Sequence, residues 1–192
     1  STYQITLPVN GNEKLTLFLY GERNLGSIYL TPGKQTLDID ASKSNELNPV
    51  DGLTKENEIL KKLADLNENV FNLRARRGDI FNVGKDTVAS SVYQKLTDYA
   101  TTLENEVAEV DDQLRQRAIQ DIRIQALMAY MNQYFGNYRR GSETLKKEWD
   151  DAYAQMLDFA NVGQAESVFS PAFADVVSNM AGKNNFMKKA HE

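Results

Sequence analysis

Few residues in this sequence could support catalysis or metal binding. His191 is the only histidine, and it lies in a polar, basic segment without the fixed partners that a catalytic base or metal ligand needs. We therefore interpret His191 as an exposed histidine and expect neither a Ser–His–Asp triad nor a histidine-rich zinc site. The sequence contains no cysteine, which excludes thiolate catalysis, disulfide bonds and thiolate metal ligands.

Two pairs of neighbouring acids, Asp111–Asp112 and Asp150–Asp151, are the remaining candidates for acid–base chemistry. Glycosidases use two carboxylates that face each other across a cleft. Neighbouring residues of a helix point about 100° apart, so neither pair can form such a clamp by itself. We therefore interpret each pair as a helix start or a solvated helix face.

The glycines and the basic residues do not indicate a phosphate or nucleic-acid site. The segment Gly84–Thr87 resembles the end of a phosphate-binding loop but lacks its first glycine and the preceding strand. A predicted helix C-terminus carries three arginines, Arg74, Arg76 and Arg77. Because the helix dipole stabilises cations at that end, we prefer this interpretation to an anion site. A formal net charge of −5 argues against a nucleic-acid partner.

An aromatic group on one predicted helix is the candidate partner contact. Aromatic residues at helical spacing usually belong to the core. All four of these cannot be buried on one narrow face, so a partner surface or shallow groove is an open alternative. The group consists of Tyr130, Tyr134, Phe135 and Tyr138. No residue set indicates a cofactor or a metal ion.

Residues 1–45 predict a small antiparallel β-meander of about four strands. Apolar residues alternate in short runs that are separated by turn signals at Asn10–Asn12 and at Pro32–Gly33. So small a sheet leaves an apolar face uncovered, and we expect the helices to cover it. The predicted strands are Tyr3–Val9, Leu15–Tyr20, Ser27–Thr31 and Leu37–Ile39.

Residues 46–182 predict a bundle of about five amphipathic helices, which makes the fold class α+β. The polar residues 42–53 are predicted to be a loop because of the turn signals Asn48–Pro49 and Asp51–Gly52. Gly182 is predicted to end the last helix, leaving residues 183–192 as a tail or linker. The helices are expected to start after Thr54, Thr87, Asp111–Asp112, Ser142 and Ser170–Pro171.

Trp149 is predicted to be a core residue. It is the only tryptophan and lies in phase with Leu145, Tyr153 and Met156 on the apolar stripe of the fourth predicted helix. No apolar run approaches the length of a transmembrane helix, and we expect neither a transmembrane segment nor a signal peptide in this sequence.

The order of elements resembles the N-terminal, non-catalytic region of Bacteroidetes-type thiol–disulfide oxidoreductases, which are thioredoxin-like lipoproteins of the cell envelope. The resemblance lies in the strand–Pro-Gly–strand segment Ile28–Asp40, the Gly- and Asn-containing segment Gly52–Asn57 and the late Ser-Pro segment Ser170–Phe173. It implies a periplasmic or envelope location, lipid anchoring of the full-length protein and a thioredoxin-like domain that follows as partner. No Cys-x-x-Cys is present, so no catalytic residue of that family has a counterpart.

Three functions remain open at this point. The leading hypothesis is a non-catalytic interaction or scaffolding module attached to a thioredoxin-like reductase. The alternative is a stand-alone envelope protein that binds a small ligand or peptide in a helical groove. An enzyme that uses carboxylates alone is the third and weakest hypothesis. The natural sequence after Glu192 would separate the first two, because a Cys-x-x-Cys that follows a strand would favour the first.

Overall fold

The chain divides into two compact units, Ser1–Asp65 and Leu66–Glu192. Sequence analysis placed the boundary after residue 45, and the difference arises because helical residues 55–59 belong with the strands. The described residues of the computed structural model are 6–8, 13–19, 23–30, 32–39, 47–49, 55–59, 61, 88–138 and 142–190.

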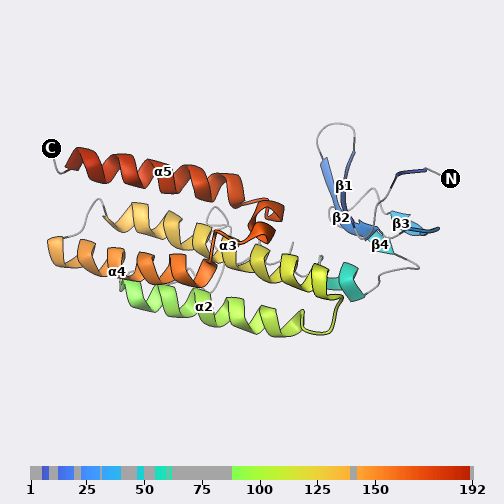
Figure 1. Cartoon of the computed structure of the whole chain (residues 1–192), viewed down its shortest axis with the longest axis horizontal. Coiled ribbons are helices and arrows are strands. Elements are labelled where there is room, and N and C mark those ends of the chain that lie inside the picture. The colour runs from blue at the N-terminus through green and yellow to red at the C-terminus, as the bar shows by residue number, and fades with distance from the viewer. Residues whose placement is uncertain are drawn as a thin grey trace. The chain divides into compact units, whose positions relative to one another are not determined.

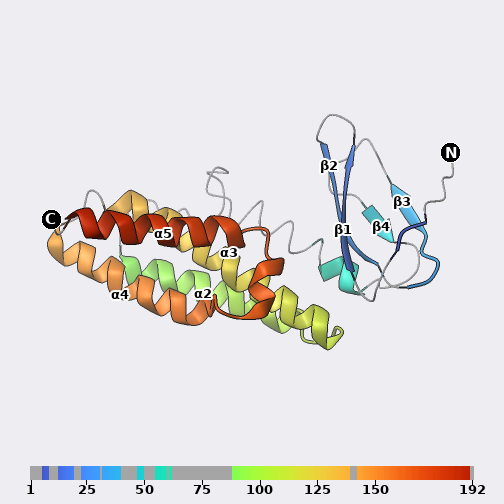
Figure 2. The same ribbon diagram turned by 45° about the horizontal axis from the view of Figure 1, so that its top comes forward.

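The strands of the first unit form two separate antiparallel pairs, and a single four-stranded meander is not shown. Strand β1 (Glu13–Leu19) pairs with β2 (Arg23–Leu30), with a register irregularity between Leu17 and Phe18. Strand β3 (Leu37–Ile39) pairs with β4 (Leu47–Pro49). Figure 2 shows the long β1–β2 hairpin and the much shorter second pair.

Two predictions about individual strands were wrong. Within the predicted strand Tyr3–Val9, the described residues 6–8 are not in a strand, and Pro8 cannot donate a ladder hydrogen bond. Conversely, β4 lies inside the predicted loop 42–53. Its Pro49 is the last residue of the strand and pairs with Leu37, a position at a strand end where proline is tolerated.

Asn57 joins the helical residues 55–59 to strand β2. The backbone N–H of Tyr29 donates to Asn57 Oδ1 at 2.7 Å, and Asn57 Nδ2 donates to the Tyr29 carbonyl at 3.4 Å. Both residues are buried. The side-chain amide of Asn57 thus makes the two hydrogen bonds to the Tyr29 N–H and carbonyl that a neighbouring strand would otherwise make.

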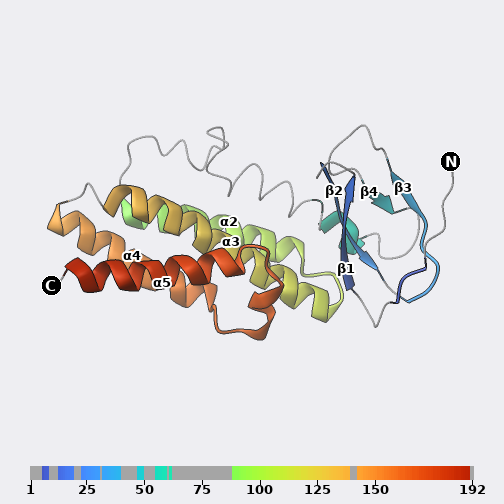
Figure 3. The same cartoon turned by 90° about the horizontal axis from the view of Figure 1, so that it is seen from above.

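In its described residues, the second unit is a bundle of four long helices and one short 3-10 helix. Figures 1 and 3 show the long helices lying side by side. Helix α3 contacts α2, α4, η2 and α5, so it is the central element. The prediction of an α+β fold with a helical bundle is confirmed at this level. The elements are α2 (Ala89–Glu106), α3 (Asp112–Tyr138), α4 (Glu143–Ala160), η2 (Ala165–Phe169) and α5 (Phe173–Ala190).

Local capping signals set several helix ends. Ser142 is the N-cap of α4, as predicted, and its Oγ accepts a hydrogen bond from the Leu145 N–H at 3.3 Å. Asp111 Oδ1 accepts from the N–H groups of Gln113 and Leu114 at the start of α3. Helix α4 ends at Ala160, and its C-cap Asn161 adopts φ 44°, in the left-handed region that closes a helix end.

The predicted start of the second helix was partly wrong. Val88, which follows the predicted cap Thr87 and was therefore expected inside the helix, is instead the N-cap of α2 and is exposed without a side-chain cap bond. The predicted cap Thr87 lies outside the described residues, as do most residues of the helix predicted after Thr54.

The prediction of a tail at 183–192 was wrong for residues 183–190, because α5 passes through Gly182 and ends at Ala190. Gly182 has no positive φ, and a Cβ added there would meet nothing within 4 Å. Glycine is therefore tolerated inside this helix at a cost of about 1 kcal/mol. Among the described helices, none is long and apolar enough to span a bilayer.

We predict that Asn57→Ala lowers the stability of the first unit by about 1–3 kcal/mol, because two buried backbone groups of Tyr29 lose their partner. Urea denaturation followed through the strand amides by NMR measures this change. Glu58→Ala is the matched control, because Glu58 is the exposed neighbour on the same helical turn. Equal effects of both substitutions would show that the Asn57 contacts do not stabilise the unit.

Candidate functional site

The aromatic group predicted as a partner contact is largely part of the core. Tyr130 and Tyr134 are buried, so neither presents its ring at the surface, and Phe135 is half-buried. The rings of Tyr134 and Phe135 meet edge to face with centroids 5.5 Å apart. Tyr138 belongs to α3, but its side chain lies outside the described residues.

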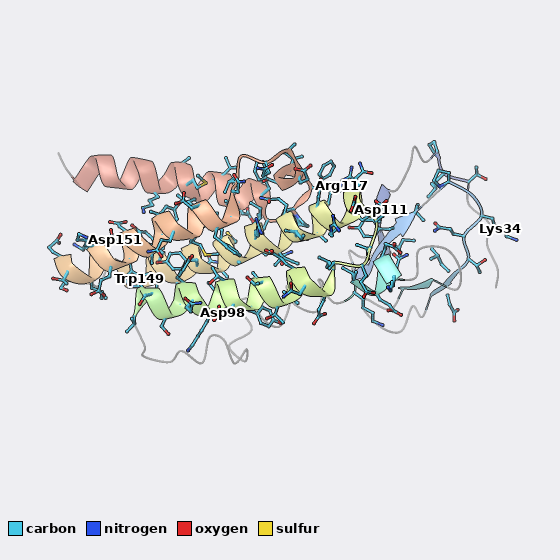
Figure 4. All side chains as sticks on the ribbon, turned by 60° about the horizontal axis from the view of Figure 1, so that its bottom comes forward. Lys34, Asp98, Asp111, Arg117, Trp149 and Asp151 are labelled. Atoms are coloured by element: carbon cyan, nitrogen blue, oxygen red, sulfur yellow. The ribbon has the colours of Figure 1, made fainter. Side chains whose placement is uncertain are left out.

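Trp149 anchors this aromatic core, as predicted. It is fully buried, and its ring centroid lies 5.5 Å from that of Tyr130 and 6.4 Å from that of Tyr134. Figure 4 labels Trp149 on α4. Tyr130 also donates its hydroxyl hydrogen bond to the Trp149 carbonyl at 3.0 Å. Among the buried side-chain nitrogens and oxygens described, only Trp149 Nε1 has no hydrogen-bond partner. The tryptophan therefore stabilises the core through packing rather than through its N–H group.

Beside this core, a lysine, a carboxylate and two tyrosines form one polar contact. Lys183 Nζ of α5 donates to Asp150 Oδ1 of α4 at 2.9 Å, and Tyr134 Oη of α3 donates to the same oxygen at 2.7 Å. The lysine nitrogen lies 3.7 Å from the ring centroid of Tyr153 and 4.3 Å from that of Tyr134. Its side chain is only 12% exposed. Asp150 is therefore not the fully solvated helix residue that sequence analysis expected.

Burial shifts the pKa values of this cluster. It lowers the pKa of Lys183, although the hydrogen bond and charge of Asp150 act in the opposite direction. Burial also raises the pKa of Tyr153 to about 12, and it raises the pKa of Tyr130 together with the nearby Asp150 charge. Tyr130 and Tyr153 are therefore protonated across the physiological range.

A second cluster fixes the segment that connects α4 to α5. Gln120 Nε2 of α3 donates to Ser167 Oγ at 2.9 Å and to the Ala160 carbonyl at 2.8 Å. Ser170 Oγ donates to Asp121 Oδ1 at 2.7 Å. These four side chains are buried. We call Gln120, Asp121, Ser167 and Ser170 the polar clamp, because they hold both ends of one short segment against α3.

The clamp holds two apolar side chains at the surface. Val168 and Phe169, which lie between the two clamp serines, are 62% and 53% exposed. The guanidinium carbon of Arg117 lies 4.0 Å from the Phe169 ring centroid, an arrangement typical of a cation–π contact. Figure 4 shows Arg117 beside this segment. We call Arg117, Val168 and Phe169 the display surface.

The other candidate residues from the sequence either lie exposed on or beside helices or are not among the described residues. Asp111 and Asp112 are exposed at the start of α3, and Asp151 is exposed and pairs with Lys147 at 2.8 Å. Among the residues described, no group of three or more acids and histidines could hold a metal ion. His191, the Arg74–Arg77 cluster and the Gly84–Thr87 segment are not among the described residues.

Sequence reasoning missed Lys183 and the polar clamp. Lys183 follows Val176 and Met180 at helical spacing, so the stripe itself could have indicated that the helix continues beyond Gly182. The clamp joins residues 47 and 49 positions apart, and no local pattern reports such pairing. Comparisons with protein-family models, curated proteins and solved structures find no match to this chain.

We predict that Trp149→Ala lowers stability by about 3–5 kcal/mol, because truncation of a buried aromatic loses apolar burial and leaves a cavity. Thermal and urea denaturation measure the loss. Trp149→Phe is the matched variant and should cost clearly less, because it keeps a ring and removes an N–H that has no partner. A native emission maximum near that of free tryptophan in water, with a small shift in the melting temperature of Trp149→Ala, would contradict the core assignment.

Proposed function

We propose that this chain is a non-catalytic interaction module that recognises a protein partner through its display surface. The observation that carries this proposal is the exposure of Val168 and Phe169 on a segment whose flanking serines are both buried and hydrogen-bonded. Most exposed apolar side chains cost affinity when they must be ordered on binding. Here the clamp has already ordered the segment, which favours a binding role.

The composition of the display surface also fits a binding role. Aromatic residues and arginine are enriched in the centres of protein interfaces and in binding hot spots. Phe169 and Arg117 supply one of each, in direct contact with each other. The guanidinium covers the ring only in part, since Phe169 is still more than half exposed. A partner would therefore gain both ring area and a guanidinium with donors in one small region.

The wider setting is proposed from the sequence resemblance. In that setting the module precedes a thioredoxin-like domain in a lipid-anchored protein of the periplasm or cell envelope. The strand–Pro-Gly–strand segment and the late Ser-Pro segment support this proposal. Because the chain has no cysteine, any thiol–disulfide chemistry would belong entirely to such a following domain.

We predict that a photo-crosslinking phenylalanine analogue at position 169 forms a discrete adduct with a partner in cells of the natural host. The same analogue at Asp158 is the matched control, because Asp158 is exposed on α4 and does not belong to the display surface. Adding Val168→Ala to the chain with the crosslinker at position 169 should lower the yield of the adduct, because apolar contact area is lost at the centre of the interface.

The fold should tolerate these substitutions, since exposed side chains usually change stability by no more than about 0.5 kcal/mol. A melting temperature equal to that of the unsubstituted chain checks this requirement. The same adducts from positions 158 and 169, or no adduct from either, would contradict an interaction role for the display surface.

A further inference from the structure

Lys183 is held as a bound ammonium ligand would be. Its nitrogen lies within 4.3 Å of two ring centroids and donates to a carboxylate oxygen at 2.9 Å. Aromatic faces that surround a cation and carry an adjacent carboxylate are a known solution for recognising ammonium groups. We call Tyr134, Tyr153 and Asp150 the ammonium cage.

The cage is built without helix α5. Tyr134 comes from α3, whereas Asp150 and Tyr153 come from α4, and these helices pack directly on each other. The Tyr134 hydroxyl donates to Asp150 at 2.7 Å, and the two rings have centroids 5.3 Å apart with their planes inclined by 40°. The three side chains therefore fix one another's positions, and Lys183 enters from a separate element.

Helix α5 holds this lysine only weakly. Within its described side chains, residues 173–183, only Val176 is buried. Gly182 immediately precedes the lysine and weakens the helix at that point, without a packing contact that requires a glycine.

We infer that the ammonium cage is a binding site for a primary alkylammonium group, and that Lys183 occupies it as an internal plug. When the part of α5 after Met180 unpacks, the lysine leaves and an external ammonium group takes its place. The ligand is either a small free amine or the lysine side chain of a partner protein, since both carry the same group. Binding of either would be coupled to the release of α5.

Asp150 restricts the ligand to ammonium groups that have N–H donors. A quaternary ammonium could rest against the faces of the two rings, but it could not donate to the carboxylate oxygen. The cage should therefore prefer n-butylammonium, which resembles the end of a lysine side chain, to tetramethylammonium. This preference distinguishes the proposed site from a purely aromatic cation site.

The experiment titrates the full chain and its variants with n-butylammonium chloride at constant ionic strength. Trp149 fluorescence reports occupancy, because its ring lies 6.4 Å from that of Tyr134. Removing the plug in Lys183→Ala should strengthen binding about tenfold relative to the unsubstituted chain, because no internal competitor remains. Gly182→Ala should weaken binding up to about fivefold, because it stabilises the helix that carries the plug by up to about 1 kcal/mol.

Two matched variants test the site itself. Lys147→Ala removes an exposed lysine that pairs with Asp151 at 2.8 Å without a contacting ring, and it should bind like the unsubstituted chain. Asp150→Asn in the Lys183→Ala background should reduce the preference for n-butylammonium over tetramethylammonium, because the charge of the acceptor is lost. A titration with N-acetyl-lysine amide distinguishes the two possible ligands. If it binds as tightly as n-butylammonium, the ligand is the lysine side chain of a partner protein. If it binds more weakly, the ligand is a small free amine.

Absence of saturable binding to Lys183→Ala, or binding no tighter than to Lys147→Ala, would overturn the inference. Equal affinity for tetramethylammonium would overturn the assignment to primary ammonium groups. If Lys183→Ala unfolds, the same titration is followed by circular dichroism. Recovery of helix with n-butylammonium, but not with sodium chloride, then supports the site, and no recovery contradicts it.

Discussion

The near-complete burial of the middle of helix α3, where only Arg123 and Met128 are half-buried, is the constraint on which the helical unit depends. From Gln120 to Met131 none of its side chains is exposed, although these residues span more than three helical turns and therefore point in every direction. A helix buried all round must either be apolar throughout or provide partners for its polar groups. Helix α3 does the second, because Gln120, Asp121 and Gln125 are all buried within this stretch.

The neighbouring elements are arranged to satisfy these groups. Gln125 Nε2 donates to Asp121, and Asp121 in turn accepts from Ser170 on the segment before α5. On the side of α2, Arg123 forms a bidentate pair with Glu104 at 2.7 and 2.9 Å, and this hydrogen bond raises the arginine pKa. An unpaired buried polar group costs about 1–3 kcal/mol, so these partners constrain where each element can pack.

Both proposed recognition features follow from the covering of α3. At one position, satisfying Gln120 and Asp121 fixes the segment that exposes Val168 and Phe169. At another, Tyr134 of α3 orients Asp150 of α4, and together they receive the lysine of α5. Helix α5 differs from α2 and α4 because, among its described side chains (residues 173–183), only Val176 is buried. It is therefore the element of the bundle best suited to move while α3 stays packed.

The sequence predicted those features that depend on local patterns. The Ser142 cap and the burial of Trp149 were correct because capping chemistry and helical spacing act within a few residues. Gly182 was misread as a helix end because glycine also occurs inside helices, where tertiary context decides. Strand β4 was missed because its residues Asn48–Pro49 also form a turn signal, and only their pairing with β3 makes the segment a strand. The polar clamp was missed because its partners lie 47 and 49 positions apart in the sequence.

Hydrogen–deuterium exchange followed by mass spectrometry tests the central claim that α3 is the fixed core and α5 the releasable element. Amides between Gln120 and Met131 should exchange most slowly, near the rate set by global unfolding. Amides of α5 after Met180 should exchange at least about tenfold faster, through a local opening that leaves α3 and α4 protected. Equal protection of these α5 amides and the centre of α3 would contradict the claim, because α5 could then open only when the whole bundle unfolds.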